Sequence, residues 1–303
     1  MPYATIRALL ANIVDYAGLF PPASLEMEAA VREFARQRAS DEAWMLGRFV
    51  VPVARLGELE QASADIWGTQ DGPFGLSVLV PGDLAAARQR IEAFQRSHAG
   101  AGHAAVEAVE RQVSSPDEVA AATAAFADLE VYLEIPHRED PSPFMEALAH
   151  RGGRAKIRSG GVTADAFPTS AELARFITAA VRAGVPFKAT AGLHHPLRGD
   201  YRLTYEPDSP SGTMHGFLNV FLASAWAKSG SMGREELAAL LEERKPGAIS
   251  WSDETVRWRG HEIDAASLAA ARAGFATSYG SCSFEEPVSD LRELGLFRAP
   301  RRA

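Results

Sequence analysis

Short runs of apolar, β-branched residues alternate along the chain with longer segments in which apolar residues recur at helical spacing. Eight runs are typical of strands: Ile13–Leu19, Arg48–Val53, Gly75–Val80, Ala105–Val109, Val131–Ile135, Arg154–Arg158, Phe187–Thr190 and Phe275–Tyr279. Helices are predicted between them, for example over Leu25–Arg38, Asp83–Ser97, Pro116–Phe126 and Ser170–Ala183. This alternation predicts an α/β protein, a parallel (β/α)8 TIM barrel, with an open doubly wound sheet as the competing topology.

The alternation is interrupted between the seventh and eighth predicted strands, where residues 193–263 exceed what one loop and one helix need. This stretch predicts helices over Met214–Lys228 and Arg234–Glu243, then a hairpin-like pair of strands over Ala248–Trp251 and Thr255–Ile263 with Arg259-Gly260 at the turn. We therefore expect one barrel domain over residues 1–303 that carries 193–263 as an insertion. The aromatic residues of the insertion add the hypothesis of a homo-oligomer.

Ionisable residues occupy one face of several predicted strands. Successive strand residues point to opposite faces, so in a barrel every second side chain points inward. Glu107, Glu134, Lys156 and Lys188 each alternate with apolar neighbours in the fourth to seventh strands. The apolar faces suit the helix layer, so we expect the charged side chains to enter the barrel near the carboxyl ends, where active sites of this architecture lie.

Two lysines in one confined space allow two interpretations. In the first, Glu107 and Glu134 neutralise Lys156 and Lys188, and the barrel is a non-catalytic binding or assembly subunit. In the second, each lysine lowers the pKa of the other and desolvation adds to the effect, which gives an amine that is nucleophilic near neutral pH. We favour the second interpretation, because Schiff-base chemistry requires such an amine.

Small residues follow the sixth and eighth predicted strands. The first loop is Arg158-Ser159-Gly160-Gly161, and the second, Gly280-Ser281-Cys282-Ser283, precedes a helix predicted around Pro287–Leu294. Backbone N–H groups of such loops and of helix N-termini bind anions. The two loops therefore predict an anion or phosphate site.

At these residues the chain resembles deoxyribose-phosphate aldolase, a class I aldolase family built on a (β/α)8 barrel. The family's Lys-Thr-Ser/Thr-Thr-Gly motif on its sixth strand is similar to Lys156-Ile157-Arg158-Ser159-Gly160, and its second lysine with the small residues after it to Lys188-Ala189-Thr190-Ala191-Gly192. The resemblance implies that Lys156 forms the Schiff base and that Lys188 lowers its pKa. It also implies that Glu107, in place of an aspartate, moves protons through bound water.

The chain departs from the family at two points. Arg158 replaces a small hydroxyl residue, and Leu193-His194-His195-Pro196 replaces the family's Gly-Val/Ile-Arg. The resemblance therefore supports a prediction of the fold more strongly than a prediction of the substrate.

The predicted function is a Schiff-base-forming aldolase or lyase that acts on a small, anionic or phosphorylated carbonyl compound and needs no cofactor. The predicted catalytic residues are Lys156, Lys188, Glu107 and Glu134. The predicted substrate or phosphate ligands are Asp15, Arg158, Gly160, Gly161, Thr190, His194, His195, Gly280, Ser281 and Ser283.

Three histidines of the insertion support a second hypothesis. His194, His195 and His215 flank the polar loop beside the predicted site. Imidazoles are ligands of zinc and iron, so a divalent metal in a metal-dependent lyase or hydrolase is the alternative. It ranks second because adjacent histidines rarely place both rings on one metal when the backbone is extended.

The composition of the chain limits the partners and the cellular location that we expect. The chain of 303 residues has 31 basic and 39 acidic residues, a net charge of −8 that argues against nucleic acid as a partner. No apolar run reaches the roughly 18–20 residues of a membrane helix. The N-terminus lacks a signal-peptide pattern, and the single cysteine, Cys282, excludes an intrachain disulfide. We expect a soluble, cytoplasmic protein with no membrane contact.

Overall fold

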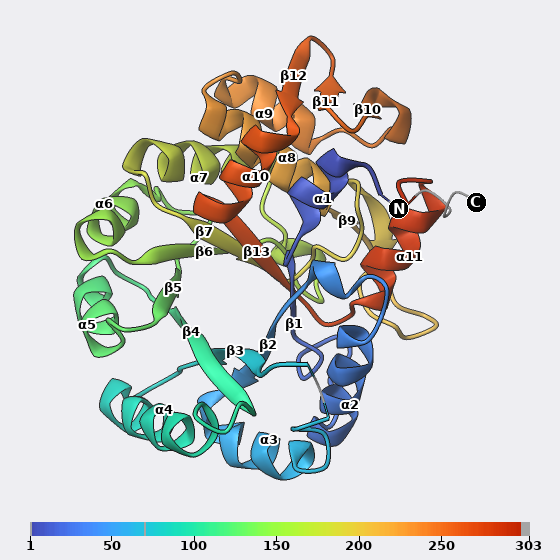
Figure 1. The fold of residues 1–303 in the computed structure, drawn as a ribbon. Helices are drawn as coiled ribbons and strands as arrows, with labels where there is room; N and C mark the ends of the chain where they lie inside the picture. The colour runs from blue at the N-terminus through green and yellow to red at the C-terminus, as the bar shows by residue number, and fades with distance from the viewer. Residues whose placement is uncertain (1, 70, 298–303) are drawn as a thin grey trace.

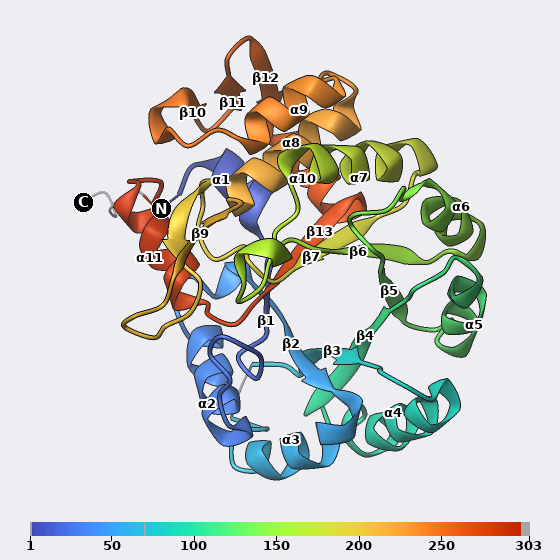
Figure 2. The same cartoon turned by 180° about the vertical axis from the view of Figure 1, so that it is seen from behind.

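Eight parallel strands form a closed barrel in the computed structural model, which describes residues 2–69 and 71–297 (Figures 1 and 2). In chain order they are β1 (Val14–Tyr16), β2 (Leu46–Pro52), β3 (Phe74–Leu79), β4 (Ala104–Gln112), β5 (Glu130–Glu134), β6 (Arg154–Arg158), β7 (Phe187–Thr190) and β13 (Ala276–Ser281). Their order around the barrel follows the chain, with β13 between β7 and β1. The predicted (β/α)8 fold is confirmed, and the open doubly wound sheet was the wrong alternative.

Helices surround this barrel (Figures 1 and 2). The helices that follow the barrel strands are α2 (Met27–Arg38), α3 (Leu56–Ser63), α4 (Leu84–His98), α5 (Asp117–Ala125), α6 (Ser142–Arg151), α7 (Ser170–Ala183), α8 (Phe217–Ser229) and α11 (Glu285–Glu293). An additional helix, α1 (Ala4–Leu10), precedes β1 and packs against α10 (Ala265–Gly274), the helix that leads into β13. Helix α7 begins with a capping box that Thr169 and Glu172 form.

Extra elements lie between β7 and β13, as predicted, and extend one side of the barrel (Figure 1). They are the hairpin of β8 (Gly199–Arg202) and β9 (Ser211–Met214), the helix α9 (Arg234–Leu241), and the strands β10 (Ile249–Trp251), β11 (Thr255–Trp258) and β12 (His261–Asp264). The predicted hairpin-like pair is therefore a three-stranded antiparallel sheet. Its second predicted strand divides at Arg259-Gly260, because Arg259 has a φ of +50° and reverses the chain there.

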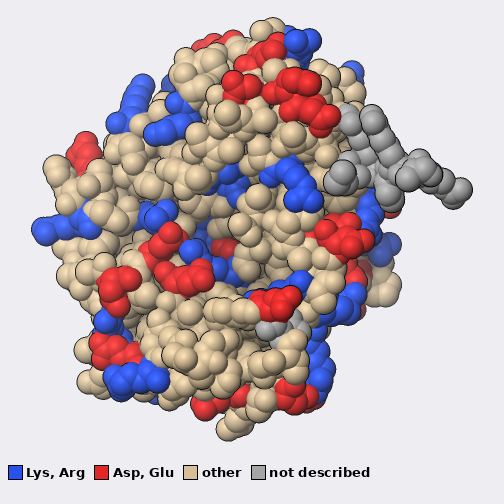
Figure 3. Space-filling model, viewed as in Figure 1, with Lys and Arg blue, Asp and Glu red and all other residues tan. Residues whose placement is uncertain are grey.

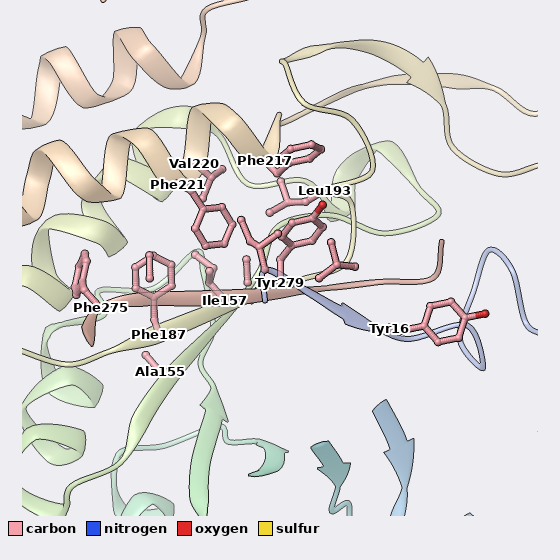
Figure 4. Close-up of a cluster of buried hydrophobic side chains, with 14 of the residues drawn as sticks. Tyr16, Ala155, Ile157, Phe187, Leu193, Phe217, Val220, Phe221, Phe275 and Tyr279 are labelled. Atoms are coloured by element: carbon pink, nitrogen blue, oxygen red, sulfur yellow. The ribbon is translucent and has the colours of Figure 1, made fainter. Parts of the chain in front are cut away.

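Helix α8 takes the place of the barrel helix that follows β7, since it packs against α7 on one side and α10 on the other. All its residues from Phe217 to Ala227 are buried, as is typical of a helix enclosed by other elements. Phe217 and Phe221 lie against Tyr279 of β13, with 5.5 and 5.9 Å between ring centroids (Figure 4). This aromatic cluster fixes the insertion to the barrel wall.

The register of β5, β6 and β7 decides where their charged side chains point. Glu134 pairs with Lys156, and Lys156 pairs with Lys188. Residues in register on neighbouring parallel strands face the same side, so all three side chains enter the barrel. The alternate residues, such as Ile157 and Ala189, belong to the core between strands and helices.

Charged side chains of both signs are interspersed over the face of the molecule shown in Figure 3. The net charge of the whole chain is −8. Within residues 2–69 and 71–297, no helix has the length and apolarity needed to cross a bilayer.

Candidate active site

The two inward lysines share a buried network of carboxylates. The Nζ atom of Lys156 lies 2.6 Å from Oε2 of Glu110 and 3.0 Å from Oε2 of Glu134. The Nζ atom of Lys188 lies 2.5 Å from Oδ2 of Asp15 and 2.6 Å from Oε1 of Glu110. Glu110 therefore bridges the two amines, with one carboxylate oxygen on each.

Asp15 belongs to the base of this network. Its Oδ2 atom also accepts a hydrogen bond of 2.7 Å from Ser278, and its Oδ1 atom accepts one of 2.9 Å from the backbone N–H of Arg48. The prediction that Asp15 contacts substrate is therefore not supported, because its two oxygens serve Lys188 and the barrel wall. Ser77 holds Glu110 in the same way, with a hydrogen bond of 2.7 Å to Oε1.

The charges of the network set the ionisation of its members. Burial would raise the pKa of Glu110, but Lys156 and Lys188 outweigh burial and hold that pKa well below its ordinary value. Burial would lower the pKa of Lys188, but Asp15 and Glu110 outweigh it, so the pKa is raised above its ordinary value. The expectation that each lysine lowers the pKa of the other is therefore wrong for Lys188. The carboxylates between the two amines are the reason.

Glu107 is not part of the site, which corrects its predicted catalytic role. Its side chain is 48% exposed and accepts a hydrogen bond of 2.8 Å from Nε of Arg48. It lines a second, polar cavity together with Glu130 and Arg154, at the other end of the barrel. The cause is a β-bulge: Leu76 pairs with Val106, but Ser77 pairs with Ala108, so Glu107 is skipped in the ladder.

The residue that fills the predicted place of Glu107 is Glu110. After the bulge β4 continues to Gln112, beyond the predicted end at Val109, and the alternation restarts one residue later. Glu110 then enters the barrel with 2% of its surface exposed. The sequence gives no signal of this placement, because the three-residue spacing of the two glutamates puts them on opposite faces of a regular strand.

A cavity of about 610 Å³ opens above Lys156, at the carboxyl ends of the strands. Seven of the predicted site residues line it: Lys156, Glu134, Arg158, Gly161, Thr190, His194 and Gly280. Lys188 lies beneath it with a side chain 1% exposed, next to Lys156 at 6%. The chain therefore places one amine at the floor of the cavity and the other behind it.

Gly160 has a packing role in place of its predicted role in binding an anion. A Cβ atom at this position would lie 2.4 Å from the ring of Phe167 and 2.8 Å from the Cα atom of Gly192. Gly192 itself has a φ of +75°, a conformation that favours glycine. The two glycines let the loops after β6 and β7 touch at the backbone and so shape one wall of the cavity.

The serines of the loop after β13 are turned into the loop itself. Ser281 donates a hydrogen bond of 2.7 Å to the carbonyl of Ser283, and the hydroxyl of Ser283 accepts one of 3.1 Å from the N–H of Glu286 in the first turn of α11. Neither serine lines the cavity, so their predicted contact with substrate is not supported. Gly280 and Cys282 of the same loop do line it.

The three insertion histidines have different hydrogen-bond partners, although Nε2 of His195 also lies 3.8 Å from Glu286. Nδ1 of His194 lies 3.1 Å from Glu286, Nδ1 of His195 lies 2.7 Å from Asp290, and Nε2 of His215 lies 2.6 Å from the carbonyl oxygen of Pro168. In the described part of the chain no three His, Cys, Asp or Glu side chains are placed to hold one metal ion. The predicted metal alternative therefore has no ligand set in His194, His195 and His215.

Only His194 of these three borders the cavity. Burial would lower its pKa, but hydrogen bonds to Cys282 and Glu286 outweigh burial and raise the pKa to about 10. His194 is therefore a cation at neutral pH. His215 shows the opposite case, because its burial lowers the pKa to about 4. Tyr205 completes this corner of the cavity, with its hydroxyl 3.5 Å from Sγ of Cys282 and 3.3 Å from Glu286.

Comparison with known proteins places this barrel among solved structures. No protein-family model and no curated protein matches the chain. A deoxyribose phosphate aldolase from Aeropyrum pernix, described as having a unique tetrameric structure, matches with a TM-score of 0.50 at 13% identity, over 96% of this chain and 97% of that chain. This chain has the same fold as that aldolase. The resemblance predicted from the lysine motifs is thus confirmed at the level of the fold.

A second solved structure is a dihydropteroate synthase from Xanthomonas albilineans in complex with 7,8-dihydropteroate. It matches with a TM-score of 0.26 at 13% identity, over 95% of this chain and 93% of that chain.

Arg158, one of the departures from the aldolase motif, lies at the edge of the cavity. Its Nε atom donates a hydrogen bond of 3.0 Å to Oε1 of Glu134, and its side chain is 48% exposed. Glu134 thus lies between Lys156 and Arg158, with one oxygen on each. Burial would raise the pKa of Glu134, but these two cations outweigh it and lower the pKa.

Proposed function

We propose that the protein is a Schiff-base-forming lyase or aldolase that acts on a small carbonyl compound, with Lys156 as the nucleophile. The observation that carries the proposal is the position of the Lys156 amine. It borders the cavity while a carboxylate, Glu110 or Glu134, lies within 3.0 Å on each of two sides. Lys188 has the same chemistry but does not border the cavity, and we assign it a positioning role.

The first step is the addition of the amine to the carbonyl carbon. Nζ of Lys156 passes one proton to Glu134 and attacks, and the carbonyl oxygen becomes a hydroxyl group by taking a second proton from Nζ. Loss of that hydroxyl as water, with the proton from Glu134, leaves an iminium ion. The iminium carries the same single positive charge as the ammonium group that it replaces, so Glu110 and Glu134 stabilise it in place.

The iminium then withdraws electrons from the neighbouring C–C bond. In the cleavage direction, Glu134 takes the proton of the hydroxyl group on the β carbon, the bond between the α and β carbons breaks, and an enamine and a free carbonyl product form. Protonation of the enamine and addition of water release the second product and restore Lys156. This sequence uses the iminium ion as the electron sink and requires no cofactor.

The predicted anionic group of the substrate and the predicted homo-oligomer are also part of this proposal. The terminal nitrogens of Arg158 and the cationic His194 favour an anionic group on the substrate. A homo-oligomer stays a prediction, which native mass spectrometry tests directly. The non-catalytic interpretation, with the lysines held in ion pairs, uses the same contacts and is the outcome to be excluded.

Reductive trapping distinguishes the two interpretations. The protein is treated with borohydride and acetaldehyde, pyruvate or dihydroxyacetone phosphate, and intact mass with peptide mapping locates the adduct. We expect one adduct on Lys156 that is absent from Lys156→Ala. Folded wild-type protein with no adduct on Lys156 from any of these compounds would refute the proposal.

A further inference from the structure

The cavity has a polar half and an apolar half. Its polar half comes from β4 to β7 and holds Lys156, Glu110, Glu134 and Thr190. In the order of strands around the barrel, β2 is four places from β6, so the two lie on opposite sides. Val50 of β2, which lines the cavity, therefore belongs to the wall across from Lys156.

Apolar residues continue this wall on both sides of Val50. They come from the segment after β1 and from the end of β3, and they are Ala17, Phe20, Pro21, Pro22, Leu79, Val80 and Pro81. Their side chains offer no hydrogen-bond donor or acceptor. A hydroxyl group pressed against them would lose its bonds to water without replacement, which is costly.

The mouth of the cavity has an exposed apolar side chain in addition to the charged Arg158. Across residues 2–69 and 71–297, the large hydrophobic side chains that are exposed are Val162, at 42%, and Tyr205, at 53%. Val162 lines the cavity, and the hydroxyl of Tyr205 lies 3.5 Å from Sγ of Cys282, which also lines it. Exposed apolar side chains that gather at one cavity mark a surface that is covered when a ligand binds.

We infer that the substrate is an amphipathic carbonyl compound, whose aldehyde or keto end lies at Lys156 and whose body is an alkyl or aryl group. This inference rests on the proposed function, because it takes Lys156 as the reacting group. The volume of about 610 Å³ suits such a molecule and exceeds the need of a two- or three-carbon compound. A phosphorylated sugar would bring hydroxyl groups to the wall around Val50, where no side chain offers them a partner, so we infer that this class binds more weakly.

The test compares hexanal with glyceraldehyde 3-phosphate in the trapping reaction, with acetaldehyde as a short reference. The exposed Lys245 corrects for the intrinsic reactivity of each aldehyde, so the measured quantity is the adduct on Lys156 divided by the adduct on Lys245. We expect this ratio to be at least about tenfold higher for hexanal than for glyceraldehyde 3-phosphate, the factor that about 1.4 kcal/mol of binding gives.

Two variants connect that preference to the apolar wall. Val50→Thr keeps the shape of the side chain and adds a hydroxyl group inside the cavity, and Val162→Ser replaces an apolar side chain by a smaller, polar one at the exposed mouth. Val51→Thr is the matched control, because Val51 is the next residue of β2 but is buried in the core outside the cavity. Both cavity variants should lower the hexanal ratio by a larger factor than the acetaldehyde ratio, whereas Val51→Thr should change neither.

The outcomes separate the inference from the function on which it rests. Acetaldehyde adducts on Lys156 together with an equal or higher ratio for glyceraldehyde 3-phosphate would overturn the inference and leave the proposed function intact. An unchanged hexanal ratio in both Val50→Thr and Val162→Ser would also overturn it. If no aldehyde, acetaldehyde included, forms an adduct on Lys156, the proposed function and this inference both fail.

Discussion

Replacing Lys188 by methionine removes a buried cation and keeps most of the side-chain volume. Lys188 contacts Asp15 at 2.5 Å and Glu110 at 2.6 Å, and its side chain is 1% exposed. Removing one partner of a buried ion pair typically costs about 3–5 kcal/mol of unfolding free energy, because the other partner stays buried without its charge. Two carboxylates lose their cation here, although Glu110 keeps Lys156. We therefore expect a loss of about 3–5 kcal/mol at pH 8.

The dependence of that loss on pH is the sharper part of the prediction. In the wild-type protein burial would raise the pKa of Glu110, but the two lysines hold it well below the ordinary value. Its contribution to stability is thus present above about pH 4.3, the ordinary pKa of a glutamate, and is lost as the pH falls. In Lys188→Met one carboxyl left without a cation takes up a proton on folding. Stability is then gained as the pH falls from 8 towards 5, a range over which the contribution of Glu110 to the stability of the wild-type protein stays constant.

Urea unfolding followed by circular dichroism at pH 8 and pH 5 measures both quantities. Lys245→Met is the matched control, since Lys245 is exposed, and it should stay within about 0.5 kcal/mol of the wild type. Adding Glu110→Gln to Lys188→Met removes one of the two surplus charges and should recover part of the loss at pH 8. A loss below about 1 kcal/mol at pH 8, or a difference in stability from the wild type that is the same at pH 8 and pH 5, would refute the buried ion pairs described here.

Further variants test the site residue by residue. Glu134→Gln should lower turnover of an aldol substrate by about 100-fold or more, whereas Glu107→Gln should leave it nearly unchanged; equal effects would contradict the assignment of Glu134 as proton carrier. Gly192→Ala should cost about 1–3 kcal/mol in urea unfolding, because its φ is +75° and the new Cβ would lie 2.7 Å from the Cα atom of Gly160; an unchanged midpoint would disprove that contact. Arg158→Gln should raise the KM of a 2-oxo acid several-fold more than that of the corresponding aldehyde, which steady-state kinetics measure; a parallel rise would assign Arg158 to Glu134 alone.

The sequence predicted the fold and half of the site because both follow from periodicity. The strands β5, β6 and β7 are regular, so their alternation placed Glu134, Lys156 and Lys188 inside the barrel. In β4 the same reasoning failed, because one bulged residue inverts the facing of every residue after it. Glu107 was chosen for a place that Glu110 occupies, and no periodicity argument reveals a bulge in advance.

The loop residues were harder to predict for a different physical reason. His195 and His215 are close in sequence to His194, but each side chain follows the local path of the backbone to its own partner, Asp290 or the carbonyl of Pro168. A loop has no repeating geometry from which such directions follow. Asp15 shows the converse case, since it was predicted as a site residue for a substrate contact and serves instead to hold Lys188.

A balance of charges explains how a network of ion pairs is compatible with a nucleophilic lysine. Lys156, Lys188 and Arg158 supply three positive charges, and their direct partners Asp15, Glu110 and Glu134 supply three negative charges. When Nζ of Lys156 passes its proton to Glu134, one cation and one anion disappear together, and the sum stays at zero.

The formation of the iminium ion restores the same pair of charges. No step therefore leaves an uncompensated charge inside the barrel, which is the condition that makes buried ionic groups costly. Lys188 is the residue that permits this compensation of charge. In the proposed mechanism Lys188 helps to hold Glu110 as an anion, and the mobile proton passes between Lys156 and Glu134, which both border the cavity and lie within 3.0 Å of each other. In the proposed mechanism, the ion pairs that characterise the non-catalytic interpretation are thus the same contacts that keep each step free of an uncompensated charge.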